Sequence, residues 1–179
     1  EVFSNLLDWS DRGTCVLFGD GAGAVVLEAS TSPGIIESVL HADGRQRHIL
    51  HAPGRLASGG VIGDPFLRMD GQAVFKFAVN AIAGIAEEVM VKAGIEPSAL
   101  DCFIPHQANI RIIQAVAKRL GVPESKCVTT VSRHGNTSAA SIPLALDNVV
   151  REGGLQGGML ALLIGVGGGF TWGANLVRM

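Results

Sequence analysis

The sequence predicts an α/β fold in which a central mixed sheet is covered by helices. Apolar runs of strand length alternate with stretches in which apolar residues recur at helical spacing. Glycine, proline, aspartate and asparagine separate most of these stretches, as they do at the ends of helices and strands. Apolar residues make up 47% of the chain, which suits strands buried on both faces or a large subunit interface. We expect residues 1–179 to form one domain.

The first elements are expected to be strands at residues 14–18, 22–27 and 35–41. Gly19-Asp20-Gly21 separates the first two, and Asp-Gly between apolar runs indicates a hairpin. The letters "GDGAG" also permit a phosphate-binding loop. That motif requires a helix directly after its glycines, and here a Val-Val-Leu run follows. The hairpin is therefore preferred.

Residues 42–65 are expected to form a long surface loop, because glycine, proline and basic residues are scattered there without periodicity. His41, His48 and His51 lie in or beside this loop. Their spacing matches no known pattern of metal ligands, so solvated histidines are expected and no metal site is predicted.

The rest of the chain alternates helices and strands. Asp70 is expected to cap a long helix that Gly94 and Pro97 end. Further helices are predicted at residues 109–120 and 138–151, with Pro143 in the first turn of the latter or kinking it. Further strands are predicted at residues 101–105, 127–131, 159–166 and 170–177, with a tight turn at 167–169.

Bulk properties exclude several classes of function. A net charge of −2, from 14 basic and 16 acidic residues, gives no argument for nucleic acid. No apolar run approaches the roughly 20 residues of a membrane span, and no secretory signal is visible. Cys15, Cys102 and Cys127 lie in apolar stretches, which is typical of reduced, buried thiols. We therefore expect a cytoplasmic protein with no nucleic-acid or membrane partner.

Chemically rich residues gather at the junctions 105–109, 134–138 and 167–169, where predicted strands end. In α/β folds, ligands bind beyond the carboxyl ends of strands, so a shared site is expected. His106 can donate a hydrogen bond or shuttle a proton near neutral pH, and the amide of Asn136 can donate without titrating. Together they could stabilise an oxyanion that develops on a carbonyl.

Each of these features also has a structural alternative. His106 could cap a loop through a hydrogen bond, and Asn136 could be a helix N-cap. The glycine run at 167–169 could be a hairpin turn, although it would also let backbone N–H groups approach a reacting oxygen.

The segments "FGDGAGAVVL", "MDGQAVFKFAV", "PHQANIRII", "RHGNTSAASIP" and "GGGFTWG" together resemble, in order, the C-terminal half of β-ketoacyl-acyl-carrier-protein synthase III. The resemblance implies a thiolase-like half with α-β-α layers around a central mixed sheet, usually in a homodimer. It implies decarboxylative Claisen condensation of an acyl-coenzyme A primer, expected to be acetyl-coenzyme A, with malonyl-acyl-carrier protein. This step initiates bacterial type II fatty acid synthesis. No cofactor is implied, since the coenzyme A thioester is a substrate.

The resemblance assigns His106 and Asn136 to the histidine and asparagine of a Cys-His-Asn triad. Both would bond the malonyl thioester oxygen as its enolate forms. Gly168 would help to form the oxyanion hole for the acyl-cysteine. In the family, the nucleophilic cysteine lies in the N-terminal half, which the segments quoted above do not match. It stands at the start of a helix, where the helix dipole favours the thiolate. The N-terminal half of the same enzyme is therefore an expected partner.

The resemblance also assigns contacts with the substrates. Arg12 would lie at the nucleotide end of coenzyme A. The pantetheine tunnel would be lined by Met69, Gly71, Ala108 and Asn109. The acidic carrier protein would dock on a basic helix face, and the residues assigned to it are Arg111, Lys118, Arg119, Gln107 and Lys76. An ordinary solvated helix face is the alternative.

Rival functions remain at this stage. A related condensing enzyme of specialised metabolism, polyketide or quinolone-type, would share the same triad. A truncated, non-catalytic thiolase-like module or dimer-forming scaffold would explain a missing nucleophile. The joint presence of His106, Asn136 and the glycine run argues against that module. A Cys-His hydrolase is disfavoured because no cysteine here is placed as a nucleophile.

Overall fold

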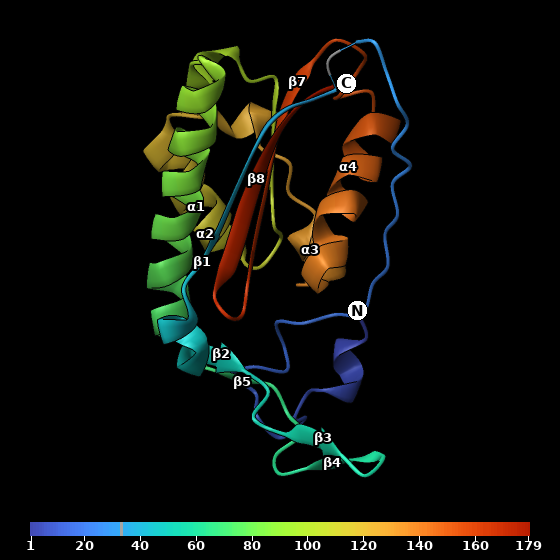
Figure 1. Ribbon diagram of the computed structural model, residues 1–179, viewed down its shortest axis with the longest axis vertical. Coiled ribbons are helices and arrows are strands. Elements are labelled where there is room, and N and C mark those ends of the chain that lie inside the picture. Colours follow the sequence, from blue (N-terminus) through green and yellow to red (C-terminus); the bar gives the residue numbers. More distant parts are fainter. Residues whose placement is uncertain (33) are drawn as a thin grey trace.

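The computed structural model describes residues 1–32 and 34–179 and places a mixed sheet between two helical layers (Figure 1). The four-stranded sheet has the order β1 (Ile35–Ala42), β8 (Thr171–Arg178), β7 (Leu160–Gly167), β6 (Cys102–Pro105). Strands β6 and β7 are parallel, and the other pairs are antiparallel. The expected α/β class with a central mixed sheet is therefore confirmed.

Helices cover the sheet unequally. α1 (Gly71–Ala93) and α2 (Ile110–Leu120) lie on one face, and α3 (Val131–His134) and α4 (Ser141–Arg151) lie on the other (Figure 1). The larger core fills the first side, and a smaller core lies between α4 and strands β6 and β7. On the outermost strand, β1, the side chain of Leu40 remains 79% exposed. Part of the second face of the sheet is thus uncovered.

α1 and α2 begin and end where the sequence predicts. Asp70 accepts a hydrogen bond from the backbone N–H of Ala73 at 3.0 Å, and Gly94 ends α1 in the left-handed conformation with φ of 67°. Asn109 accepts from the N–H of Arg111 at 2.8 Å, and Gly121 ends α2 in the same way with φ of 68°. Side-chain caps and glycine stops thus fix both helices.

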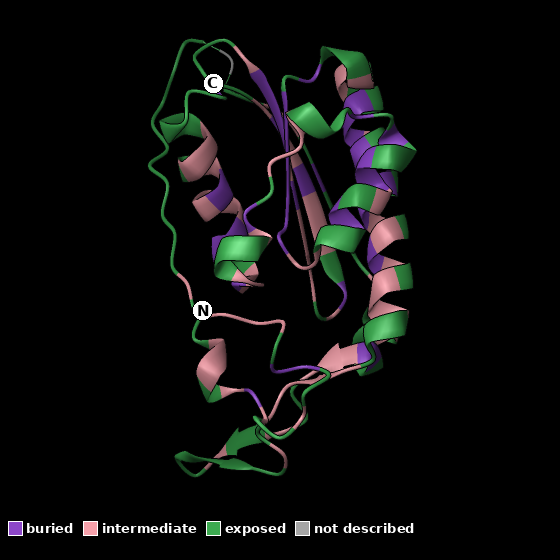
Figure 2. Cartoon of the chain, turned by 180° about the vertical axis from the view of Figure 1, so that it is seen from behind, coloured by how far each residue is buried: buried purple, intermediate pink, exposed green. Residues whose placement is uncertain are grey.

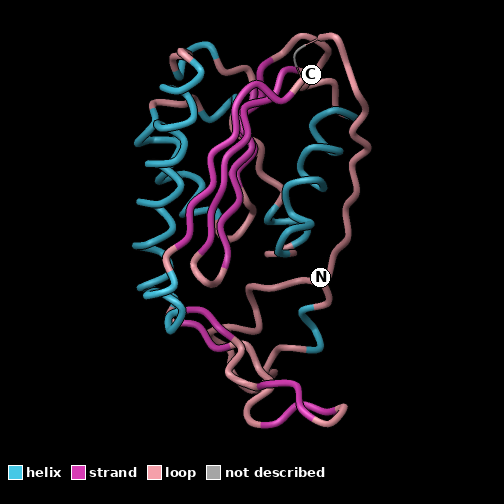
Figure 3. Tube along the Cα trace, viewed as in Figure 1, coloured by secondary structure: helices cyan, strands magenta, loops and turns pink. Residues whose placement is uncertain are grey.

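The predicted surface loop at 42–65 contains more structure than expected. Two small antiparallel pairs lie beyond the end of the main sheet (Figure 3): β2 (Leu50–His51) with β5 (Arg68–Met69), and β3 (Arg55–Ala57) with β4 (Gly60–Ile62). Short 3₁₀ turns are found at η1 (Phe3–Asn5), η2 (Gly44–Ile49), η3 (Pro97–Ala99), η4 (Glu124–Lys126) and η5 (Ser138–Ala140).

The predicted hairpin around Gly19-Asp20-Gly21 is wrong, because this segment bonds to other parts of the chain. Gly19 donates its N–H to the carbonyl of Asn136, and Asn136 donates to the carbonyl of Leu17, each at 2.9 Å. The Asp20 carboxylate accepts from the backbone and hydroxyl of Ser4. A Cβ on Gly19 would lie 2.5 Å from a backbone carbonyl oxygen, so this approach requires glycine.

Residues 22–27, predicted as a strand, have no strand partner in the described chain. They run extended and exposed alongside α4 (Figure 2), with Val26 94% exposed. At the start of this run a Cβ on Gly23 would collide with Pro143 of α4, so the two segments are packed closely.

The strand predicted at 127–131 is also wrong. Cys127 makes only an isolated parallel bridge to Phe103, and Val128 donates to the carbonyl of Phe103 at 2.9 Å. The N–H of Thr130 is then taken by a side chain, Oε1 of Gln107, at 2.7 Å. The backbone turns into α3 there, so the junction that carries Asn136 follows a short helix instead of a strand.

In the described residues, no helix combines the length and the apolar character that crossing a membrane would require.

Candidate active site

His106 lies at the carboxyl end of β6, as predicted. Its backbone N–H donates to the carbonyl of Ile164 at 2.7 Å, which continues the parallel ladder between β6 and β7 by one residue. The side chain is 8% exposed. Its Nδ1 atom lies 2.6 Å from the hydroxyl of Ser141, the first residue of α4. The sheet and a helix on its second face thus fix the imidazole together.

Burial sets the charge of His106. Removal from water disfavours the imidazolium and lowers the pKa of His106 from 6.5 to about 4. The ring is therefore neutral near pH 7. A neutral imidazole has one donor and one acceptor nitrogen, so it can stabilise an oxyanion without carrying a fixed charge.

The side chain of Asn136 is oriented by its own turn. Its Oδ1 accepts a hydrogen bond from the N–H of Ser138 at 3.0 Å. The N-cap position of η5 is Thr137, one residue further on, so the alternative of a helix N-cap at Asn136 is not borne out and the bond closes a local turn. The amide NH₂ has no acceptor among the described residues. The turn thus holds the side chain of Asn136 by its oxygen, and the role of its amide as a donor to substrate stays a prediction.

His106 and Asn136 line the same two neighbouring cavities, of about 670 and 640 Å³. These volumes lie within the range of small-molecule sites, about 300–1,000 Å³. The first cavity is also lined by the residues assigned to pantetheine, Met69, Gly71, Ala108 and Asn109. Residues from three separate parts of the sequence, 69–71, 106–109 and 136, therefore converge at one cavity.

Gly168 lines the second cavity together with His106 and Asn136. A Cβ at this position would lie 2.9 Å from the carbonyl oxygen of Leu50, which also lines both cavities. Glycine is required there by a close backbone approach. The proposed oxyanion-hole role of Gly168 stays a prediction.

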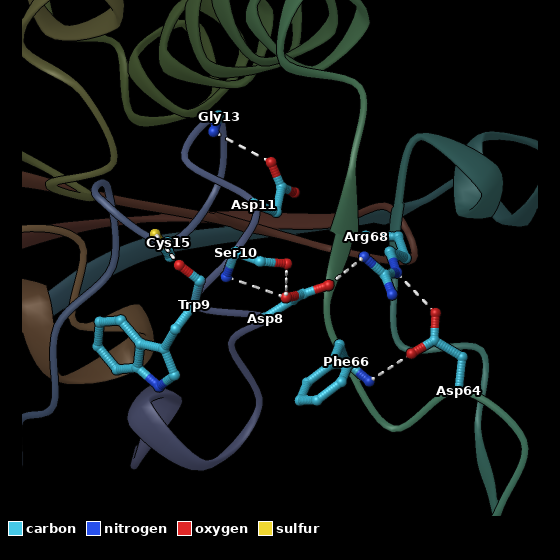
Figure 4. A network of polar contacts seen from close by, with 9 residues as sticks. All are labelled: Asp8, Trp9, Ser10, Asp11, Gly13, Cys15, Asp64, Phe66 and Arg68. Atoms are coloured by element: carbon cyan, nitrogen blue, oxygen red, sulfur yellow. Dashed lines mark hydrogen bonds and ion pairs between the residues drawn. The ribbon is translucent and has the colours of Figure 1, made fainter.

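Arg12 is exposed and adjoins Gly13, which lines the first cavity. A polar network holds this loop in place (Figure 4). Arg68 donates to Asp8 at 3.1 Å and to Asp64 at 2.6 Å. The hydrogen bond from Arg68 is the main cause that lowers the pKa of Asp64, while the hydroxyl of Ser10 is the main cause for Asp8. The network ties residues 8–15 to the chain that leads into α1.

The basic residues assigned to the carrier protein, Lys76 on α1 and Arg111, Lys118 and Arg119 on α2, are exposed. Arg119 bonds across to α1, to Asn80 at 3.0 Å and more loosely to Glu87 at 3.8 Å. Arg111 lies over the ring of Phe75, at 5.7 Å from its centre, and also lines the first cavity. The basic face therefore reaches the cavity mouth.

Gln107 does not belong to that face, and its assignment to the carrier surface is corrected. The side chain is 1% exposed. Its Nε2 donates to the carbonyls of Pro105 at 2.7 Å and Val128 at 3.1 Å, and its Oε1 accepts from Thr130. Both the amide nitrogen and the amide oxygen of Gln107 are thus engaged in hydrogen bonds inside the protein. Gln107 joins the loop after β6 to the segment before α3.

None of the cysteines is placed as a nucleophile. Cys15 and Cys102 are buried, Cys127 is half-buried, and neither cavity has a cysteine in its described lining. Burial raises the pKa of both Cys102 and Cys127 to about 11, so their thiols stay protonated near neutral pH. The described residues also contain no cluster of side chains that could hold a metal ion.

Fold and site together define an α/β protein in which a neutral histidine and an asparagine line one cavity. Two family models match the chain: 3-oxoacyl-[acyl-carrier-protein] synthase III over residues 1–44, and the C-terminal model of the same family over residues 90–179. The chain therefore belongs to the 3-oxoacyl-[acyl-carrier-protein] synthase III family, and its thiolase-like fold is that of the family.

Individual relatives agree with this assignment. The chain is 60% identical over its whole length to the β-ketoacyl-[acyl-carrier-protein] synthase III of Bordetella petrii, and covers 55% of that protein. The crystal structure of the Aquifex aeolicus synthase III matches with a TM-score of 0.92 and 43% identity, over 99% of this chain and 55% of that one. A priming β-ketosynthase of a polyketide pathway matches with a TM-score of 0.88 and 40% identity, over 99% and 54%. The chain thus spans about half the length of these relatives.

Sequence reasoning missed Ser141, which contacts the ring of His106. The two residues lie 35 positions apart, and a serine in an apparent helix start gives no signal of its own. Only the packing of α4 against the end of β6 brings them together.

The Gln107→Ala variant should be markedly destabilised. It leaves the buried N–H of Thr130 and carbonyl of Val128 without partners, which should lower the free energy of unfolding by about 2–4 kcal/mol. Urea unfolding measures the change. Gln114→Ala, on the exposed side of α2, is the matched control and should change stability by less than about 0.5 kcal/mol. Equal stability of the two variants would contradict the role of Gln107.

Burial of His106 predicts a pH dependence of stability. The folded ring accepts a proton only near pH 4, whereas the unfolded ring accepts one near its ordinary pKa of 6.5. The unfolded state binds more protons in this window, so the free energy of unfolding should fall by up to about 3 kcal/mol as pH drops from 6.5 to 4. Urea unfolding at several pH values should show this component in wild type and in His134→Gln. Its persistence in His106→Gln would refute the assignment.

Proposed function

We propose that this chain supplies the decarboxylation half of the active site of a synthase that condenses an acyl-coenzyme A primer with malonyl-acyl-carrier protein. One observation carries the proposal: neutral His106 and the free amide of Asn136 line the same cavity. This pair suits a reaction in which negative charge develops on a thioester oxygen. The product would be a 3-oxoacyl-acyl-carrier protein, which initiates fatty acid synthesis.

The proposed chemistry follows from the two donors. When the malonyl thioester loses CO₂, the electrons of the broken carbon–carbon bond move to the thioester oxygen and form an enolate. Donors from His106 and Asn136 stabilise that oxygen as its charge grows. The enolate carbon then attacks the carbonyl of an acyl-cysteine, and the cysteine leaves as thiolate. Gly168 would offer its backbone to the acyl oxygen of that step.

The nucleophilic cysteine is proposed to come from the N-terminal half of the same enzyme. Support comes from the thiols of this chain, which lie outside the cavities, and from the uncovered sheet face. The second cavity extends from His106 and Asn136 to Leu40 and Asn175 on that face. A half-enzyme docked there would cover exposed apolar residues and bring its cysteine to the donors.

Substrate contacts are proposed along the first cavity. Met69, Gly71, Ala108 and Asn109 would line the pantetheine arm, with Arg12 near its nucleotide end. Coenzyme A is a substrate in this scheme and no cofactor is required. A cytoplasmic homodimer is the proposed setting, since the apolar composition suits a large subunit interface.

A related condensing enzyme of specialised metabolism is the second candidate. The 40% identity to a priming β-ketosynthase of a polyketide pathway favours it specifically. Both candidates use the same donors, and they differ in the acyl primer. Comparing acetyl-coenzyme A with longer acyl-coenzyme A primers separates them.

The proposed function can be tested in a chimera in which this chain replaces the matching part of the Bordetella petrii relative. The chimera should condense acetyl-coenzyme A with malonyl-acyl-carrier protein. Asn136→Ala should lower kcat by about 10²–10³-fold, as for loss of one oxyanion donor. The 179-residue chain alone should acquire no cysteine thioester from radioactive acetyl-coenzyme A. A folded chimera without condensation, or labelling of the chain alone, would overturn the proposal.

Carrier docking makes a separate prediction. Arg111→Glu should weaken binding of acyl-carrier protein to the chimera about fivefold or more, because a rim charge that faced an acidic partner is reversed. Binding is measured by titration calorimetry at low salt. Arg151→Glu on α4 makes the same charge change away from this face and should leave the affinity intact. If both variants weakened binding of acyl-carrier protein equally, the effect would come from net charge alone and docking on this face would be contradicted.

A further inference from the structure

We infer that Ser141 is a positioning residue that holds the ring of His106 in the tautomer with its proton on Nε2. The ring then presents a hydrogen-bond donor to the cavity and cannot accept a proton there. The nature of the substrate oxygen rests on the proposed function, but the position of the ring proton does not.

The direction of one hydrogen bond follows from the backbone. The Oγ atom of Ser141 lies 3.2 Å from the backbone nitrogen of Gln107 and 2.6 Å from Nδ1 of His106. A backbone N–H can only donate, so Oγ accepts from Gln107. The Ser141 side chain is buried at 1% exposure, and these are its only hydrogen bonds within the described residues.

The remaining hydrogen bond, between Oγ of Ser141 and Nδ1 of His106, can be donated by either atom. If Nδ1–H donated to Oγ, the hydroxyl proton of Ser141 would be buried without an acceptor, which is unfavourable. If the hydroxyl donates to Nδ1, both the hydroxyl proton and the Nδ1 lone pair have a partner. The second direction is therefore the stable one, and in a neutral imidazole it leaves the proton on Nε2.

The Nε2 atom is available to a ligand. It has no hydrogen-bond partner in the described residues, and it is not among their fully buried polar atoms that lack a partner. Because His106 lines both cavities, Nε2–H is directed at the same space as the Asn136 amide. Two fixed neutral donors suit an oxygen that gains negative charge. A ring with a free Nε2 lone pair would instead act as a base.

The same cluster explains why the tautomer is stable. Ser141 belongs to α4, Gln107 to the loop after β6, and His106 to the end of the β6 ladder. The hydroxyl of Ser141 therefore accepts a hydrogen bond from the backbone N–H of Gln107 and donates one to Nδ1 of His106. If the hydroxyl rotated away from Nδ1, this series of hydrogen bonds would be broken and the hydroxyl proton would have no other acceptor.

Nitrogen-15 NMR of histidine-labelled protein tests the inference on the 179-residue chain. Long-range proton–nitrogen correlations show which ring nitrogen carries the proton, and the His106→Gln variant assigns the signal. At neutral pH, His106 should show a protonated Nε2 and an unprotonated, hydrogen-bonded Nδ1. A proton on Nδ1 in the wild-type chain, or a cationic ring, would overturn the inference without any variant.

Two variants then test the role of the hydroxyl. Ser141→Ala should shift the Nδ1 resonance downfield, towards an unbonded nitrogen, and Ser141→Thr should restore it because the donor returns. The ring of exposed His134 should be unchanged in both and serves as an internal control. An unchanged Nδ1 resonance in Ser141→Ala would refute the contact. If the chimera failed to condense while the tautomer was as stated, the proposed function would fail and this inference would stand.

Discussion

The site depends on the hydrogen bonds that join the loop after β6 to the chain around α3 and α4. Gln107 reaches the carbonyl of Val128 and the N–H of Thr130, and Ser141 reaches both Gln107 and His106. All of these groups are wholly or partly buried, so water cannot easily replace a lost partner. The bonds therefore fix the separation between the segment that carries His106 and the segment that carries Asn136.

Burial of this network also determines its chemistry. The imidazole is removed from water without a carboxylate beside it, which keeps it neutral. The Asn136 amide cannot titrate, and its oxygen is occupied by its own turn. A substrate oxygen would thus meet two preorganised neutral donors, and no protein charge would need to be compensated before that oxygen becomes negative.

Local signals in the sequence predicted part of this arrangement. Side-chain caps and glycine stops placed α1 and α2, and the end of an apolar strand placed His106, because these features depend on neighbours in sequence. The Gly-Asp-Gly hairpin failed because Gly19 bonds to Asn136, far along the chain. Gln107 was misjudged because a glutamine usually lies on the surface, and its buried partners are set only by tertiary packing. Ser141 was missed for the same reason.

The uncovered face of the sheet adjoins the two donors, because the second cavity is lined by residues of both. Leu40 is exposed although its sequence surroundings are those of a buried strand, and the second cavity runs from Leu40 to His106. Exposing such a side chain to water is unfavourable, so its burial would favour the binding of a segment that covers it. The thiols of the chain, by contrast, are held where burial suppresses thiolate. A division of labour follows, in which this chain fixes the neutral donors and the covering segment is proposed to bring an activated thiolate to them.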